Sequence, residues 1–341
     1  MWKVFGQDSL RDHLASTHKK GSLHHAYLFT GPEKTGKKLM AMDLAKALNC
    51  ESQDAPCDCC DSCRRIDAFL HTDVWLVDLS GQPDGAASRK EISTGEIQEI
   101  QHSASLPPFE GRTRVFIIDG AENLSSFAAN RLLKTLEEPP PRVVFILLAE
   151  SSDNVLTTIV SRCQHMVFKN VNHSHLALYI SQQFKVDDAK AKLVAQLSGG
   201  HPGWAITAVK NQKILTDFIE KRDRLLGLYQ ANREEKFSYA EDTSARFGSD
   251  RQSVIEELKI WQTLTRDILY AQFGLEENII NCDVFEPLRE LAGLYSTQDI
   301  RNILFTIGRA IDQLGHNVTP RLVMETMMLA LECPEAVAVK L

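Results

Sequence analysis

The sequence predicts an α/β domain with a mostly parallel sheet, followed by a small helical segment and a final all-α domain. Three observations lead to this fold class. Short apolar runs rich in Val, Ile and Phe alternate with helical patterns up to about residue 170. A glycine-rich loop follows the first of these runs, and the strand pattern disappears after residue 171. Such alternation is typical of a parallel sheet that helices cover on both faces.

The first part of the chain contains the candidate strands. Each is a short apolar run of the length expected for a buried strand. A helical pattern with apolar residues at helical spacing covers 39–48, and another covers 128–138. The expected strands are 26–30, 74–79, 115–119, 143–149 and 164–168.

The second part is expected to be entirely helical. Apolar stripes at helical spacing predict helices around 254–268 and 300–314. Ser296 and Asp299 have the spacing of a capping box at the start of the second helix. Thr319 and Pro320 are typical of another helix start, with Thr as the cap and Pro at the first helical position.

Composition and charge exclude several classes of protein. The chain has 38 Lys and Arg against 45 Asp and Glu, a formal charge of −7, so its net charge does not favour nucleic acid. Its longest apolar run, 143–149, is far shorter than the ~20 residues of a membrane helix. The first residues lack the apolar core of a signal peptide. We therefore expect a cytoplasmic protein with reduced thiols and no membrane partner.

Residues 31–38, Gly-Pro-Glu-Lys-Thr-Gly-Lys-Lys, lie between a predicted strand and a predicted helix, as a P-loop requires. Gly31 and Gly36 would let backbone N–H groups approach phosphates at the helix N-terminus. Lys37 would reach the β- and γ-phosphates. The next residue should be Ser or Thr, whose hydroxyl helps to hold magnesium, but Lys38 has no lone pair for a metal. We expect a degenerate nucleotide-binding loop, and binding of ATP or ADP stays open.

Asp119 ends the apolar strand 115–119, which is similar to a Walker B strand. Its carboxylate would lie beside the P-loop and hold magnesium. The alternative interpretation is a helix cap or a turn residue. Gly120 follows Asp119, and Glu122 lies two positions further along.

Four cysteines, Cys50, Cys57, Cys60 and Cys63, have a spacing that allows thiolates to converge on a tetrahedral zinc ion. Cys59 lies within the set and is interpreted as a spare. A disulfide and buried thiols are the alternatives. A reducing compartment disfavours the first, and the acidic and proline residues of the segment, typical of an exposed loop, disfavour the second. Four thiolates would close the coordination sphere, so we expect a structural zinc that orders the loop.

Four stretches together resemble one family. They are His-Ala-Tyr-Leu-Phe-Thr-Gly-Pro at 25–32, the four-cysteine insert at 50–63, Ala-Ala-Asn-Arg-Leu-Leu-Lys-Thr-Leu-Glu-Glu-Pro-Pro at 128–140, and Ser-Arg-Cys at 161–163. The set resembles the AAA+ subunits of the bacterial DNA polymerase III clamp loader, over essentially the whole chain. This resemblance implies an AAA+ nucleotide-binding-type domain at 1–170 with its zinc insert, a helical lid at 171–212, and a helical collar for oligomerisation at 213–341.

The family contains two types of subunit, the γ/τ motor and δ′, and three positions of this sequence distinguish between them. The γ/τ motor has a complete P-loop, a glutamate after the Walker B aspartate, and a sensor-2 arginine in the lid. Lys38, Gly120 and Gly203 stand at about those positions here. The resemblance therefore implies the δ′ type, a component of the polymerase III holoenzyme with no intrinsic catalysis expected. An active γ/τ-type ATPase is the alternative.

In δ′ subunits, the arginine of Ser-Arg-Cys acts in trans as an arginine finger on ATP held by the adjacent motor subunit. The resemblance assigns this role to Arg162. A planar, always-charged guanidinium suits γ-phosphate oxygens and the charge that develops in phosphoryl transfer. The alternative is a surface arginine in a structural ion pair. Cys163 is interpreted as a packed thiol.

The resemblance also implies the partners. These are the γ/τ and δ subunits, the sliding clamp, and primed DNA in the assembled complex, where the clamp is loaded for replication. Candidate DNA contacts are Arg89, Lys90, Arg112 and Lys134. Glu150 and Ser151 are the candidates for the sensor-1 position.

Overall fold

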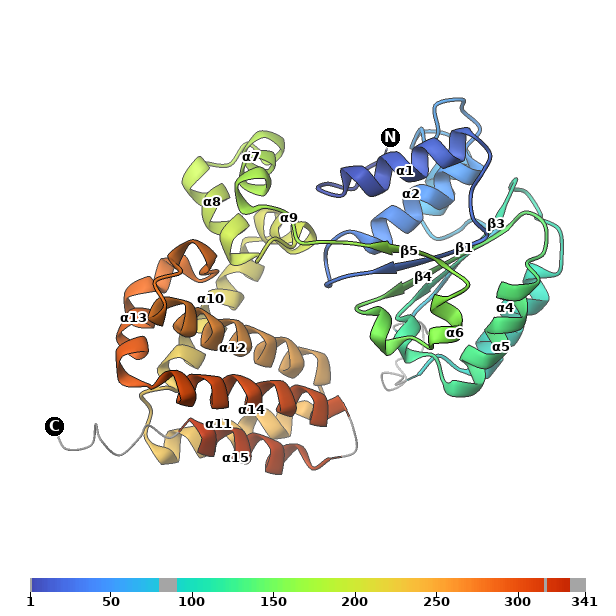
Figure 1. Ribbon diagram of the computed structural model, residues 1–341. Helices are drawn as coiled ribbons and strands as arrows, with labels where there is room; N and C mark the ends of the chain where they lie inside the picture. The colour runs from blue at the N-terminus through green and yellow to red at the C-terminus, as the bar shows by residue number, and fades with distance from the viewer. Residues whose placement is uncertain (1, 80–90, 316–317, 332–341) are drawn as a thin grey trace. The chain divides into compact units, whose positions relative to one another are not determined.

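The structure is a computed structural model, and it describes residues 2–79, 91–315 and 318–331 (Figure 1). The chain divides into two compact units, each described here by itself. The first comprises Met1–Leu176 and Gly200–Trp204, and the second comprises Ala177–Gly199 and Ala205–Leu341. The predicted lid at 171–212 is thus shared between the two units, and the boundaries of three domains stay a prediction.

A parallel sheet of five strands forms the centre of the first unit, in the order β2-β3-β4-β1-β5 (Figure 1). This confirms the predicted parallel sheet. The strands are β1 Ala26–Thr30, β2 Val74–Val77, β3 Arg114–Asp119, β4 Val143–Ala149 and β5 Gln164–Val167. The predicted strand extends to residue 79, but β2 is an edge strand that pairs with β3 alone among the described strands and ends at Val77.

Helices cover both faces of this sheet, which explains why its strands are continuous apolar runs. On β3, Val115 and Ile117 pack with α1 and α2, whereas Phe116 and Ile118 pack with α4 and α5. The covering helices are α1 Asp8–Lys19, α2 Lys37–Asn49, α4 Thr94–Ala104 and α5 Ser126–Glu137. Helix α5 starts two residues before the predicted 128 because Ser125 caps it, accepting a hydrogen bond from the Ala128 N–H.

Short elements complete the first unit. Helix α3, which the sequence analysis did not predict, lies in the cysteine insert between α2 and β2. These elements are α3 Asp61–Asp67, the 3-10 helices η1 Ala121–Asn123 and η2 Ser152–Asn154, and α6 Thr157–Val160.

From α7 onward, the described part of the chain contains helices and no strand, as predicted. Helices α7 and α9 each begin with residues of the first unit and continue into the second. The helices are α7 His173–Phe184, α8 Asp188–Leu197, α9 Pro202–Lys210, α10 Gln212–Gly227, α11 Arg233–Phe247, α12 Arg251–Gln272, η3 Glu276–Asn278, η4 Cys282–Val284, α13 Phe285–Leu294, α14 Thr297–Gly315 and α15 Pro320–Ala330.

The core of the second unit is built around Trp261, which is fully buried on α12. The rings of Tyr229 and Tyr239 meet Trp261 edge-on. The predicted capping box is present, because Ser296 Oγ accepts from the Asp299 N–H and Asp299 accepts from the Ser296 N–H. Within 2–79, 91–315 and 318–331, no helix combines the length and apolar character needed to cross a membrane.

Candidate functional site

The glycine-rich loop connects β1 to the start of α2, as predicted for a P-loop. Gly31 and Gly36 have φ angles of +139° and +102°, which favour glycine. A side chain on Gly31 would lie 2.3 Å from the Phe168 carbonyl oxygen, and one on Gly36 would lie 2.7 Å from Val4. Both glycines are therefore required by the path of this chain, whatever the loop binds.

Lys37 points back onto the loop that precedes it. Its Nζ donates hydrogen bonds to the carbonyl oxygens of Gly31 and Pro32, the latter at 2.9 Å. Burial lowers the pKa of Lys37, although Glu150, Glu122 and Asp119 oppose this shift. The amine that would reach nucleotide phosphates is satisfied here by carbonyl groups of its own loop.

Lys38 lies at the position where a P-loop has its metal-binding hydroxyl. Its Nζ is 3.2 Å from Oδ2 of Asp78 and 3.3 Å from Oδ2 of Asp119. Magnesium prefers oxygen ligands in octahedral geometry, whereas an ammonium group offers only donors and positive charge. The residues present therefore do not fit a magnesium ion held as in an intact P-loop.

The chain after β3 turns through Gly120 and Glu122. Gly120 has a φ of +92° and opens η1, in which Glu122 lies. Oε1 of Glu122 accepts a hydrogen bond from the Glu150 N–H at 3.3 Å. The Glu150 carbonyl accepts in turn from the Gly31 N–H at 3.1 Å. Glu122 thus helps to connect the ends of β3 and β4 to the glycine loop.

A segment distant in sequence contacts the glycine loop within the first unit. The Gly203 N–H donates to the Lys34 carbonyl at 2.8 Å, and Nδ1 of His201 lies 2.7 Å from the Glu33 carbonyl oxygen. A side chain on Gly203 would approach the Lys34 oxygen to 2.8 Å. In the sequence, Gly203 stands only where the family has an arginine, but in the structure it contacts the loop so closely that a larger residue is excluded.

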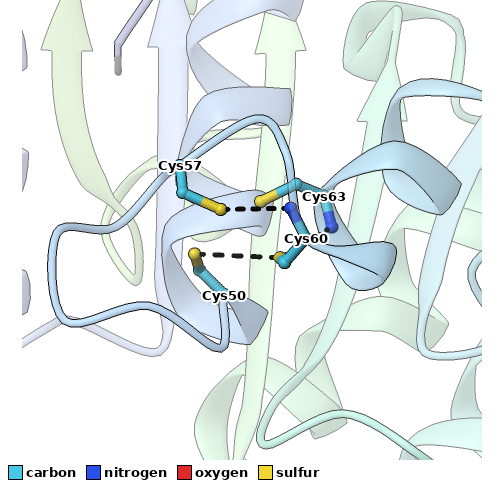
Figure 2. A group of neighbouring side chains, drawn as sticks. All are labelled: Cys50, Cys57, Cys60 and Cys63. Atoms are coloured by element: carbon cyan, nitrogen blue, oxygen red, sulfur yellow. Dashed lines mark hydrogen bonds between the residues drawn. The ribbon is translucent and has the colours of Figure 1, made fainter.

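The four predicted cysteine ligands converge (Figure 2). The Sγ atoms of Cys50, Cys57, Cys60 and Cys63 all lie within 4.8 Å of one another. Cys50 follows α2, Cys60 caps α3 and Cys63 lies inside α3, so two helix ends position three ligands. Cys59 lies outside this group and is exposed. The donor set fits a tetrahedral ion such as zinc, with no open coordination position.

The environment of the thiols also suits a metal site. Backbone N–H groups of Cys59 and Cys60 lower the pKa of Cys57 to about 6, which favours the thiolate. Burial raises the pKa of Cys63. A cation bound among the four sulfur atoms would favour their deprotonation. The loop is less exposed than the sequence analysis expected, since Pro56 is buried.

A buried lysine anchors the cysteine loop, and the sequence analysis missed it. Nζ of Lys46, on α2, lies 3.0 Å from Asp43, 2.6 Å from Asp58 and 3.1 Å from Asp67. Burial alone would lower the pKa of Lys46, but these three carboxylates raise it overall. The i, i+3 spacing of Asp43 and Lys46 on a helix was the available signal.

A second buried ion pair joins the residue before β2 to the first residue of β3, and no sequence pattern predicted it. Asp73 accepts hydrogen bonds from the N–H groups of Phe109, Glu110 and Gly111. It also pairs with Arg114, whose Nη2 lies 2.8 Å from Oδ1. Burial opposes ionisation of Asp73, but these donors outweigh it and hold its pKa at about 2. The pair fixes the turn before β3, at the opposite end of that strand from Asp119.

Arg162 lies just after α6, and its side chain is one-third exposed. Nη1 donates to the Thr158 carbonyl at 2.8 Å and contacts Ser161 Oγ at 3.3 Å. Nη2 donates to Oε1 of Glu137, at the end of α5, at 2.6 Å. The neighbouring Cys163 is partly buried, and burial raises its pKa to about 12, in keeping with a packed thiol.

The remaining candidate residues lie elsewhere. Lys134 is exposed on α5, and the backbone N–H of Arg112 donates to Asn49. Arg89 and Lys90 lie outside the described residues. Ser151 caps η2 by accepting from the Asp153 N–H. Their roles in DNA binding and as sensor 1 stay predictions.

The fold and the loop define an α/β protein with a parallel five-stranded sheet, a P-loop-like turn between β1 and α2, and a helical C-terminal region. The family model described as "DNA polymerase III, delta subunit" matches residues 6–172. The "DNA polymerase III subunit delta'" of Bacillus subtilis is 30% identical over 318 residues, 92% of each chain. The chain belongs to the clamp-loader family of DNA polymerase III subunits and is similar to its delta' (δ′) member.

Two further proteins are similar to this chain. The "DNA polymerase III subunit tau" of B. subtilis is 28% identical over 350 residues, which cover 96% of this chain and 60% of that protein. A solved gamma subunit-related protein of Thermotoga maritima is 17% identical, with a TM-score of 0.48, over 96% of this chain and 98% of that chain.

Proposed function

We propose that this chain is a δ′-type subunit that does not hydrolyse ATP itself and supplies Arg162 to ATP bound by a neighbouring motor subunit of the clamp loader. The absence of hydrolysis is inferred from the contact of Lys38 with Asp78 and Asp119. An ammonium group lies where hydrolysis needs magnesium. Gly120, after Asp119, supplies no carboxylate for activating water.

The contacts of Lys37 support the same conclusion. In P-loop ATPases this lysine neutralises the β- and γ-phosphates. Here it donates to Gly31 and Pro32 of the loop itself. Nucleotide would have to break these bonds before it could use the amine. Binding of ATP or ADP by Gly31, Gly36 and Lys37 is therefore expected to be weak.

The position of Arg162 supports a role in trans. Its hydrogen-bond partners are Thr158, Ser161 and Glu137, which lie outside the glycine loop 31–38. One-third of the side chain is exposed, so a second molecule can reach it. A guanidinium brought to a γ-phosphate stabilises the charge that develops during phosphoryl transfer. This chain would contribute only the arginine, and the neighbour would supply the nucleotide and the metal.

The rest of the chain fits a subunit that acts through other proteins. Cys50, Cys57, Cys60 and Cys63 would hold a zinc that orders the insert of the first unit. Residues 171–212 would form the lid, and 213–341 the collar that joins the subunits. The partners would be the γ/τ and δ subunits, the sliding clamp, and primed DNA in the assembled complex.

The decisive experiment uses a reconstituted loader in which only the motor site adjoining this chain is intact. Arg162→Ala should reduce clamp- and DNA-stimulated ATP hydrolysis at that site by about 10³-fold or more. Arg162→Lys should restore little of this hydrolysis, because an ammonium lacks the planar pair of donors that a guanidinium offers to phosphate oxygens. Arg11→Ala serves as the control, since Arg11 also pairs with carboxylates of the first unit. Undiminished hydrolysis with Arg162→Ala would exclude the finger.

The second candidate is an active γ/τ-type ATPase. It is favoured by the 28% identity to a tau subunit and by the presence of Lys37 and Asp119. This function requires magnesium-dependent turnover by the chain alone. The two candidates therefore differ in a single measurement, the rate at which the isolated chain hydrolyses magnesium-ATP.

A further inference from the structure

Lys38 connects three elements of the first unit through one ammonium group. It lies in the first turn of α2, Asp78 directly follows β2, and Asp119 ends β3. Strands β2 and β3 are parallel neighbours whose last pair is Val77 with Ile118. The two carboxylates therefore leave adjacent strands at the same edge of the sheet. Both place Oδ2 within 3.3 Å of the same Nζ.

This arrangement has the ligand chemistry of a cation site with the cation already supplied by the chain. Two carboxylates beside each other repel, and each is more stable with a positive charge between them. In an intact P-loop protein, that charge is a divalent ion that also binds a hydroxyl of the loop. Here the residue that should carry the hydroxyl carries the charge instead.

We propose that the Lys38 ammonium is a built-in replacement for the divalent cation, so that the site between Asp78 and Asp119 takes up no magnesium. This inference rests on the proposed absence of hydrolysis and names the residue responsible for it. A divalent ion at this place would have to displace Nζ or lie close to a positive charge. The carboxylates would otherwise be a suitable pair of oxygen ligands for magnesium.

The burial of the three groups sets the size of the expected effect. The side chains of Lys38, Asp78 and Asp119 are 42%, 20% and 34% exposed. Solvent therefore screens the contacts in part, and their effect on stability is modest. What distinguishes a cation replacement from an ordinary surface ion pair is its response to magnesium once the ammonium is removed.

The test compares the melting temperature of the full chain with and without magnesium chloride, at constant ionic strength and without nucleotide. Lys38→Met removes the charge and leaves both carboxylates, so magnesium should raise its Tm by about 2 °C or more. Wild type and Lys38→Arg both keep a cation at this position. Magnesium should therefore raise their Tm by less than half of that amount. Adding Asp119→Asn to Lys38→Met should abolish the response, because one ligand is lost.

A second variant covers the case in which Lys38→Met fails to fold. Lys38→Thr supplies the hydroxyl of an intact P-loop, and it should bind Mn²⁺, followed by electron paramagnetic resonance, at least tenfold more tightly than wild type. An equal magnesium response in wild type and Lys38→Met, or equal Mn²⁺ affinity in wild type and Lys38→Thr, would overturn the proposal. Neither measurement involves Arg162 or a neighbouring subunit, so failure here leaves the finger proposal intact.

Discussion

Nη2 of Arg162 donates a hydrogen bond to Oε1 of Glu137 at 2.6 Å. The arginine proposed to act on a neighbour's ATP is therefore paired with a carboxylate of its own chain. Both groups are partly exposed, at 33% and 50%. Pairs of this kind contribute about 0.2–1 kcal/mol, so another anion can displace the carboxylate at little cost.

Replacement of Glu137 by glutamine should make the finger more available. The amide keeps an oxygen that can accept from Arg162 but removes the negative charge that competes with the γ-phosphate. Release of about 0.5–1 kcal/mol corresponds to a rise of roughly two- to fivefold in clamp- and DNA-stimulated ATP hydrolysis. The measurement is steady-state phosphate release by the reconstituted loader.

Glu138→Gln is the matched control for this variant, because Glu138 is the adjacent exposed glutamate. It changes the net charge equally, so any general electrostatic effect on assembly should appear in both variants. If Glu137→Gln instead lowers the rate of stimulated ATP hydrolysis to that of Arg162→Ala, the carboxylate orients the arginine and does not compete with the γ-phosphate for it.

The chain alone should release phosphate from magnesium-ATP only at background rate. Lys38 supplies no metal ligand, and Gly120 supplies no base after Asp119. Asp119→Asn should therefore leave the rate of the isolated chain unchanged. Robust turnover that disappears in Asp119→Asn would establish the γ/τ-type alternative and refute the proposed absence of hydrolysis.

Metal analysis of the purified chain should find about one zinc per molecule, since four thiolates complete one tetrahedral site. Cys60→Ser should lose most of the zinc and lower the Tm, because Cys60 is one of the four converging cysteines and also caps α3. Cys59→Ser should keep the metal and the stability of wild type, since Cys59 lies outside the group. Equal zinc loss in the two variants would contradict the assigned ligand set.

Acid should destabilise the first unit through Asp73. Its pKa is about 2 in the folded chain, against ~3.9 in an unfolded one. The folded state therefore binds fewer protons between these values, and the stabilisation is complete above about pH 4 and is lost as the pH falls through 2. The difference corresponds to about 2–3 kcal/mol. Urea unfolding between pH 7 and 2 measures it.

Asp73→Asn should cost about 3–5 kcal/mol at neutral pH, because it leaves the buried Arg114 without its carboxylate. The variant should also flatten the acid dependence. Glu110→Gln is a suitable control, since Glu110 pairs with Arg65 nearer the surface and should contribute less than about 1 kcal/mol. Similar losses in both variants would argue against a special role for the Asp73 network.

The sequence by itself determined the parallel sheet, the helical second part and the convergence of the four cysteines. These features depend on local patterns, namely apolar runs of strand length and the spacing of Cys57, Cys60 and Cys63, which a single chain displays directly. The departure at Lys38 was equally visible, because it changes one residue of a short motif.

Only the tertiary structure decided what those residues contact. It brings Lys38 to Asp78 and Asp119, and Arg162 to Glu137, from positions 25 to 81 residues apart in the sequence. Ion pairs over such separations depend on how strands and helices pack, and no local pattern encodes them. The sequence therefore predicted the loss of a magnesium ligand at Lys38. The lysine contacts both Asp78 and Asp119 because the parallel strands β2 and β3 end side by side.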